Sequence, residues 1–233
     1  MKKPVLIIIA IIVVVAIAVF GYMVVSDLGQ EKELTAELEE ITTLVNAEEL
    51  DTDQIQERLD RTVTNGDYAT VERAFKQYIS DGLDNVTRIS EILEDERLVT
   101  GLTAENYQED GPEFTETKAY IEETRQELQE LKTAYSEFFT EEKAMSYIND
   151  KGLDSYFVDY YKNEVIGDVE AANDTEEVES SIDEVISILD TTENVINFLS
   201  ENKDSWEIEN NMIMFNDDNL SRQYDELVAK IQA

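Results

Sequence analysis

The N-terminal part of the chain contains one long apolar segment. The 21 residues from Val5 to Val25 carry no charge, and Gly21 is the one position in the run that is not apolar. As a helix this run extends roughly 31 Å, which matches the hydrocarbon thickness of a bilayer. The sequence therefore predicts a transmembrane helix over residues 5–25, in contact with membrane lipid.

The charges on either side of this run orient it. Lys2 and Lys3 precede it, whereas Asp27 follows it at the start of an acidic segment. Positively charged flanks remain on the cytoplasmic side of a membrane. We therefore predict a cytoplasmic tail over residues 1–4 and a cell-membrane protein whose chain after residue 25 is extracytoplasmic.

A cleaved signal peptide is the alternative to a retained anchor. Residues 16–18 read Ala-Ile-Ala, which resembles the small-residue cleavage site A-x-A. Cleavage after Ala18 would leave residues 19–25 as an apolar stub at the new N-terminus. We therefore favour a retained single-pass anchor, with cleavage as the open alternative.

After a predicted linker over residues 26–30, apolar residues recur at helical spacing along residues 31–233. Steps of three and four residues place them on one face of a helix, and each stretch therefore predicts an amphipathic helix. The only prolines are Pro4 and Pro112, so no helix interior is broken. The predicted fold is an all-α ectodomain, an antiparallel helical bundle. Its stripes are Leu34, Leu38, Ile41 and Val45; Ile55, Leu59 and Val63; Val71, Phe75, Tyr78, Gly82, Val86, Ile89 and Leu93; and Val178, Ile182, Val185, Leu189, Ile196 and Leu199.

The most regular stripe lies between residues 121 and 138. It alternates steps of three and four over two heptads, the spacing that packs helices nearly side by side. It comprises Ile121, Thr124, Leu128, Leu131, Tyr135 and Phe138.

Three segments depart from the helical pattern. Residues 100–115 are long for a connection in a bundle, and residues 150–154 surround Gly152 and predict a break between two helices. In residues 206–215, apolar residues recur at every second position, at Trp206 and Ile208 and again at Ile213 and Phe215. These pairs flank Asn210-Asn211, which predicts a short β-hairpin because Asn tolerates positive φ.

The C-terminal segment from Trp206 to Ile231 is rich in apolar residues for its length. After the predicted hairpin, a last helix over about residues 219–231 carries a further apolar stripe. The hairpin and the helix each have one apolar face, and both faces are buried most simply if the two elements cover the same core. We therefore expect this segment to dock on the helices.

Composition excludes several kinds of chemistry. The chain has no His and no Cys, which rules out a Ser-His-Asp triad, His- or Cys-ligated metals and disulfides. Beyond residue 25 it has 16 basic and 54 acidic residues, a net charge of −38, because two of the 18 bases are Lys2 and Lys3. This charge repels nucleic acid and favours a basic protein partner.

No catalytic motif stands out, and we expect neither an enzyme nor a cofactor. Ser200-Glu-Asn-Lys203 matches S-x-x-K, but the companion S-D-N and K-T-G motifs are absent. A glycan-directed envelope enzyme that uses a pair of carboxylates is the alternative class, since a glycoside hydrolase needs only two acids. Because the chain has 54 acidic residues, any two of them can be proposed as a catalytic pair, so the presence of such pairs is no evidence for this class of enzyme.

One acidic segment is a candidate metal site. In the stretch that we call the acidic loop, residues 105–116, carboxylates gather around Gly111 and Pro112. Calcium takes such oxygen ligands, but the EF-hand pattern is missing, and a solvated loop is the favoured interpretation. A calcium-responsive binding module is therefore a further alternative. The candidate ligands are Glu105, Glu109, Asp110, Glu113 and Glu116.

An aromatic row is a candidate binding surface. Tyr156, Phe157, Tyr160 and Tyr161 form two neighbouring i, i+4 pairs on one helix. An exposed row would offer rings for stacking on a glycan or a peptide. Rows of this kind more often belong to a core, and we favour core packing.

The sequence resembles a known group of proteins along most of its length. The N-terminal MKK and apolar anchor, followed by ILEDERL, LTAENYQEDGPEFTETKAYI and NFLSENKDSWEIENNMIMF, is similar to a family of uncharacterised single-pass proteins of Gram-positive bacteria. The resemblance implies a cell-envelope setting and no site residue. Together with the composition, it leads us to expect a membrane-tethered extracytoplasmic protein that acts by binding or scaffolding, of undefined oligomeric state.

Overall fold

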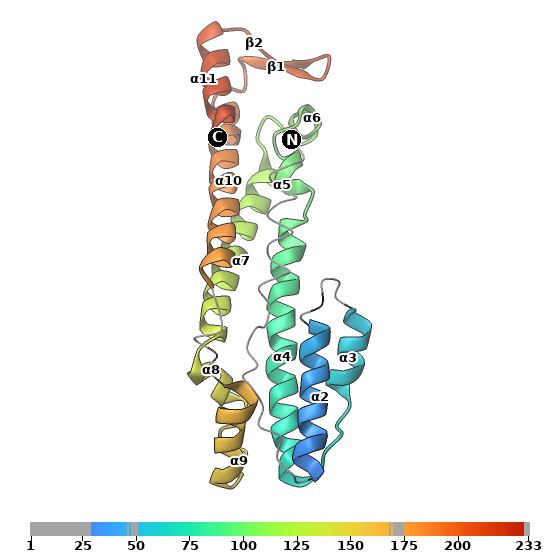
Figure 1. The fold of residues 1–233 in the computed structure, drawn as a ribbon. Coiled ribbons are helices and arrows are strands. Elements are labelled where there is room, and N and C mark those ends of the chain that lie inside the picture. Colours follow the sequence, from blue (N-terminus) through green and yellow to red (C-terminus); the bar gives the residue numbers. More distant parts are fainter. Residues whose placement is uncertain (1–28, 46, 48–50, 168, 170–174, 231–233) are drawn as a thin grey trace. The chain divides into compact units, whose positions relative to one another are not determined.

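The part of the chain that the structure describes is mostly helical and contains an antiparallel β-hairpin, as the sequence predicts (Figure 1). The predicted transmembrane helix lies outside the part that the structure describes. Within the described part, no helix is both long and apolar enough to cross a membrane. The computed structural model describes residues 29–45, 47, 51–167, 169 and 175–230.

The helices and strands follow one another in the order shown in Figure 1. The first described helix begins at Gly29, so that the last two residues of the predicted linker are helical. The bounds are α2 Gly29–Val45, α3 Thr52–Asp60, α4 Gly66–Leu93, α5 Arg97–Thr100, α6 Ala104–Glu109, α7 Thr115–Phe138, α8 Glu141–Ser146, α9 Ser155–Tyr160, the π-helix η1 Tyr161–Ile166, α10 Thr175–Glu201, β1 Trp206–Glu209, β2 Met212–Phe215 and α11 Asp218–Ala229.

The segment predicted as one ectodomain divides into two compact units. The first unit comprises the described residues up to Ser90 together with Lys132–Glu179. The second comprises Glu91–Leu131 together with the described residues from Ser180 onward. Helices α4, α7 and α10 contribute residues to both units.

The core of the first unit contains the predicted stripe of α2 and an aromatic stack. Leu34 and Leu38 are fully buried. The rings of Tyr78 and Phe138 stack with centroids 4.5 Å apart. A Cβ atom on Gly82 would lie only 2.8 Å from the Phe138 ring, so the absence of a side chain here permits the ring to approach α4.

The core of the second unit is covered by the C-terminal segment. The side chains of β1, β2 and α11 that pack against this core include Trp206, Ile208, Ile213, Phe215 and Tyr224. The predicted docking of the C-terminal segment is therefore confirmed for its described residues. The buried core cluster comprises Tyr107, Phe114, Val195, Ile196 and Leu199.

The predicted seam on α7 is also confirmed. All six of its positions are buried, including the hydroxyl-bearing Thr124, which is 7% exposed. The long stripe on α10 from Val178 to Leu199 is buried as well. Periodic apolar positions therefore identify the buried faces of the long helices correctly.

The second predicted stripe, Ile55, Leu59 and Val63, is wrong at its last position. Helix α3 ends at Asp60, and Val63 lies in the extended segment that follows. The backbone amides of Val63 and Thr64 donate instead to the buried carboxylate of Glu72, at 2.9 Å each. A side-chain acceptor has replaced the helical partners of these two amides.

Two of the three segments predicted to depart from the helical pattern, residues 100–115 and 150–154, differ in structure. Residues 100–115, which are long for a connection in a bundle, contain the short helix α6, whose first turn is capped by the Thr103 hydroxyl. The predicted break at residues 150–154 is confirmed, since Gly152 has a positive φ of 73° and Asp154 caps α9.

The predicted hairpin is confirmed in position and turn. Asn210 and Asn211 have φ of 51° and 62°, the two positive values of a type I′ turn. The pairs Trp206↔Phe215 and Ile208↔Ile213 face the core, and the alternate pairs Glu207↔Met214 and Glu209↔Met212 face away. We call these last four residues the outer face of the hairpin.

Candidate functional site

The aromatic row is divided between core and surface. Tyr161 is fully buried, whereas Tyr156 is 49% exposed. Phe157 and Tyr160 are half-buried, because each packs edge-on against Tyr68 of α4, with ring centroids 5.0 Å and 6.1 Å apart. The row therefore does not present four rings to solvent.

A buried carboxylate ties the exposed end of this row to two helices. Glu31 of α2 is 2% exposed and accepts hydrogen bonds from the hydroxyls of Tyr68, at 2.6 Å, and of Tyr156. Burial and the bond to Glu31 raise the pKa of Tyr68 above its usual value. Both phenols therefore remain neutral donors, and the arrangement clamps α9 to α2 and α4.

The carboxylates of the acidic loop have separate partners. Asp110 accepts from the backbone amides of Glu116, at 3.1 Å, and Thr117, at 2.7 Å, and thus caps the start of α7. Against the opposing effect of burial, the hydrogen bonds from Thr117 lower the pKa of Asp110. Glu113 pairs with Lys203 at 3.1 Å on the surface.

The remaining candidate ligands, Glu105, Glu109 and Glu116, are exposed. Among the residues that the structure describes, no three carboxylates gather closely enough to hold a metal ion. The calcium site remains a prediction without a converged ligand set in this part of the chain.

The first unit contains a group of buried charges that the sequence analysis did not single out. We call it the buried ion cluster: Glu37, Glu72 and Lys76, which are at most 4% exposed, with Arg58 and Arg61. The Glu37 carboxylate accepts from Arg58 Nη1, Arg61 Nε and Lys76 Nζ, each at 3.0 Å. Lys76 Nζ also lies 2.8 Å from Glu72 Oε1.

Backbone groups complete the coordination of these charges. Lys76 Nζ donates to the carbonyl oxygens of Arg58, at 2.7 Å, and Arg61, at 2.9 Å. Glu72 accepts from the Thr64 hydroxyl at 2.7 Å, besides the two amides named above. The cluster therefore fastens the end of α3 and the following segment to α2 and α4.

The hydrogen bonds of the cluster hold both acids ionised. Against the opposing effect of burial, the bonds from Arg61 and Lys76 lower the pKa of Glu37 from 4.5 to about 2. Burial by itself would raise the pKa of Glu72, but the hydrogen bonds from Lys76 and Thr64 outweigh this effect, so that the pKa of Glu72 is also lowered. Because the charges satisfy one another, we interpret the cluster as structural.

A sequence signal for this cluster existed. Glu37 lies three residues after Leu34 and four before Ile41, inside the apolar stripe of α2. Glu72 and Lys76 are spaced i, i+4 beside the buried stripe of α4. Charged residues inside a stripe of apolar positions predict buried partners, since an unpaired buried charge is costly.

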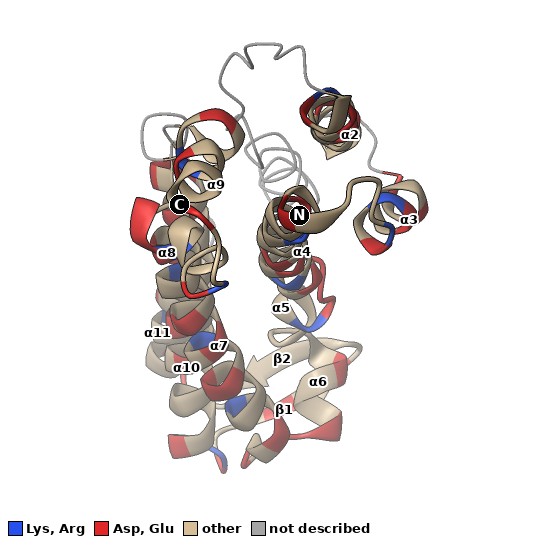
Figure 2. Cartoon of the chain, turned by 90° about the horizontal axis from the view of Figure 1, so that it is seen from below, with Lys and Arg blue, Asp and Glu red and all other residues tan. Residues whose placement is uncertain are grey.

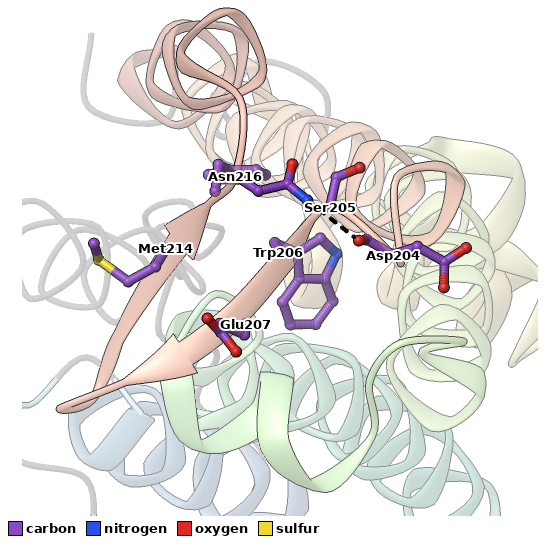
Figure 3. Close-up of a pocket in the computed structure, with 7 residues that line it drawn as sticks. Asp204, Ser205, Trp206, Glu207, Met214 and Asn216 are labelled. Carbon is purple, nitrogen blue, oxygen red and sulfur yellow. Dashed lines mark hydrogen bonds between the residues drawn. The ribbon is translucent and has the colours of Figure 1, made fainter.

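The second unit has a pocket at the open end of the hairpin (Figure 3). Its volume is about 210 Å³. Trp206 and Met214 extend from the hairpin in different directions, and the Trp206 Nε1–H donates to the Leu199 carbonyl oxygen at 2.9 Å. The lining residues are Asp204, Ser205, Trp206, Glu207, Met214, Phe215 and Asn216.

Acidic residues outnumber basic ones on the helices of both units (Figure 2). Several basic side chains are shared by more than one acid. Arg125, for example, contacts Glu122 at 2.6 Å, Asp190 at 2.8 Å and also Glu193. Internal ion pairs therefore leave a large excess of acids at the surface.

Comparisons of the chain with models of protein families, with curated proteins and with solved structures find no match.

Proposed function

We propose that the protein is a membrane-tethered binding or scaffolding component of the cell envelope, whose acidic extracytoplasmic part recruits a basic protein partner. The excess of surface acids carries this proposal. If each of the 16 bases after residue 25 neutralised one of the 54 acids, 38 acids would remain uncompensated. Where three acids share one base, as at Arg125, they share a single positive charge, so such contacts leave the excess unchanged.

The uncharged run over residues 5–25 supports the tether. Its length fits a bilayer, and Lys2 and Lys3 favour a cytoplasmic N-terminus. The acidic surface would also repel anionic lipid headgroups and so hold the folded units in solvent beside the membrane. A partner with an excess of Lys and Arg would be attracted to the same surface.

Fractionation and protease treatment test the tether. We expect the full chain to remain in washed membranes and its acidic part to be digested by protease added to cells with an opened wall. Ile12→Arg with Val15→Arg places two charges in the middle of the run, where each costs about 3 kcal/mol, and should abolish membrane retention.

The outcomes separate the alternatives. Protection of the acidic part in intact cells would reverse the proposed topology. A mature chain that begins at Val19 and leaves the membrane would establish cleavage and would refute the tether. Binding to a basic partner is tested separately by the titration described below.

A further inference from the structure

The outer face of the hairpin combines apolar and acidic side chains in alternation. Across the two strands, Glu207 lies opposite Met214 and Glu209 lies opposite Met212. Side chains of directly opposed residues in an antiparallel pair are in contact range, so each methionine has a carboxylate beside it. The inner face is held on the core by Trp206 and its neighbours, which fixes the orientation of the outer face.

The two methionines are unusually exposed for this protein. Met212 is 59% exposed and Met214 is 46% exposed. The other exposed large apolar residues of the described chain are Val99 and Tyr156, on separate elements. Methionine is flexible and polarisable, and it is common on protein surfaces that bind several different partners.

The pocket of Figure 3 continues this face. Met214 and Glu207 belong to both, and Asp204 adds a further carboxylate. Its lining contains acidic, apolar and neutral polar residues but no Lys or Arg. The neighbouring base Lys203 is paired with Glu113. The local charge is therefore negative beside an apolar surface.

We propose that the outer face of the hairpin, together with this pocket, is the docking surface for a basic segment of a partner protein. The proposal rests on the proposed function and specifies where its partner binds. The aliphatic stems of Lys or Arg would cover Met212 and Met214, and their cationic ends would reach Glu207, Glu209 and Asp204. Apolar residues between the cations would fill the pocket.

Charge complementarity selects this occupant over three others. A second copy of the chain carries the same net charge of −36 and would be repelled. An anionic lipid surface would be repelled for the same reason. A nucleic acid is disfavoured by its phosphates. A basic protein segment alone matches both the apolar and the acidic groups of the face.

Trp206 provides a direct readout. It is the only tryptophan in the chain, and it lines the pocket. A ligand that enters the pocket changes the surroundings of the indole ring, so the emission of Trp206 should shift on binding. A ligand held elsewhere by general electrostatic attraction should leave that emission unchanged.

The test uses the full chain in bilayer discs of phosphatidylcholine, a lipid without net charge. The probe is a short peptide in which Lys alternates with Leu, titrated at constant ionic strength and followed by Trp206 emission and by calorimetry. We expect saturable binding and a shift in emission. Met212→Thr with Met214→Thr removes both apolar side chains and introduces a residue type that favours strands. This double variant should weaken binding by about tenfold or more.

A matched pair of double variants isolates the acids. Glu207→Gln with Glu209→Gln should weaken binding by about tenfold, because two cations lose their partners. Glu33→Gln with Glu39→Gln removes the same charge from exposed positions of α2 and should change the affinity by less than about twofold. Circular dichroism of each variant verifies that the fold is retained.

The outcomes distinguish this inference from the proposed function. If the peptide binds all variants equally, or without a shift in Trp206 emission, the acidic protein binds a basic partner but the hairpin is not its site. If no Lys-containing peptide binds the wild-type chain, both proposals fail. Concentration-dependent dimers abolished by the methionine variants, or binding to vesicles of phosphatidylglycerol, would assign the face to another occupant and overturn the inference.

Discussion

Replacement of Glu37 by Gln tests the buried ion cluster most sharply. Glu37 is 4% exposed, and its carboxylate accepts from Arg58, Arg61 and Lys76. Glu37→Gln keeps the size and shape of the side chain but removes the charge. It also turns an NH₂ group towards a set of donors, so that one or more donors lose their acceptor.

The expected loss of stability is about 3 kcal/mol at neutral pH. A buried ion pair that loses one partner costs about 3–5 kcal/mol, since the other charge remains buried. The value lies near the lower end here, because Lys76 keeps Glu72 and the Arg61 side chain, 44% exposed, regains water. The lowering of the Glu37 pKa from 4.5 to about 2 corresponds to a similar energy.

The pH dependence has a definite sign. The pKa of Glu37 is lower in the folded chain than its ordinary value, so the folded state favours the ionised form. Its contribution is therefore complete above about pH 4.5 and is lost as the pH falls towards about 2. The difference between wild type and Glu37→Gln should shrink over that range and approach zero at its lower end.

Urea titration of the full chain in detergent micelles, followed by far-ultraviolet circular dichroism, measures this difference. Trp206 emission follows the second unit in the same titration and separates its transition from that of the first unit, which contains Glu37. Glu39→Gln, an exposed position on the same helix, is the control and should change the free energy of unfolding by less than about 0.5 kcal/mol. A loss below about 0.5 kcal/mol for Glu37→Gln, or a loss independent of pH, would refute the reasoning.

Four further predictions concern the cores and the surface charge. Leu128→Ala, at a fully buried position of the seam, should cost about 2–5 kcal/mol in denaturant titrations, and a loss under about 0.5 kcal/mol would contradict its burial. Gly82→Ala should cost about 1–3 kcal/mol in the same assay, because its Cβ would press on the Phe138 ring. Trp206 should emit at shorter wavelength in the folded than in the denatured chain, and Phe215→Ala should move the folded emission towards red; emission already at the exposed wavelength would refute the docking. Monovalent salt should raise the melting temperature by relieving acid repulsion, whereas a large gain specific to calcium would instead support a site in the acidic loop.

Much of the fold follows from apolar spacing in the sequence. The stripe from Ile121 to Phe138 is buried at each predicted position, because steps of three and four fix one face of a long helix. The hairpin was predictable for a different reason. Asn210 and Asn211 are a residue pair that tolerates two positive φ values in succession, and the alternation of Trp206 and Ile208 with Glu207 and Glu209 sets the faces of the first strand.

Other features depend on contacts between segments far apart in the chain. Val63 follows the apolar pattern of α3, but the backbone amide of Val63 donates to the carboxylate of Glu72 and not to a carbonyl oxygen of the helix. Met214 lies among apolar neighbours, yet the register with Glu207 places it on the outer face. The division of the aromatic row likewise depends on Tyr68, which is 88 positions before Tyr156 in the sequence. The spacing of apolar residues within one segment does not identify these partners, because they lie in other segments of the chain.

Crosslinking in living cells tests the central claim, recruitment of a basic partner outside the membrane. A photoreactive amino acid at Met212, with the same group at Glu39 as the control site, would capture the segment bound to the hairpin. The account predicts an adduct from position 212 whose captured segment is rich in Lys or Arg. External protease should remove this adduct, and Glu207→Gln with Glu209→Gln should reduce its yield. Equal adducts from both sites, or a captured segment that is acidic, lipid or a second copy of this chain, would contradict it.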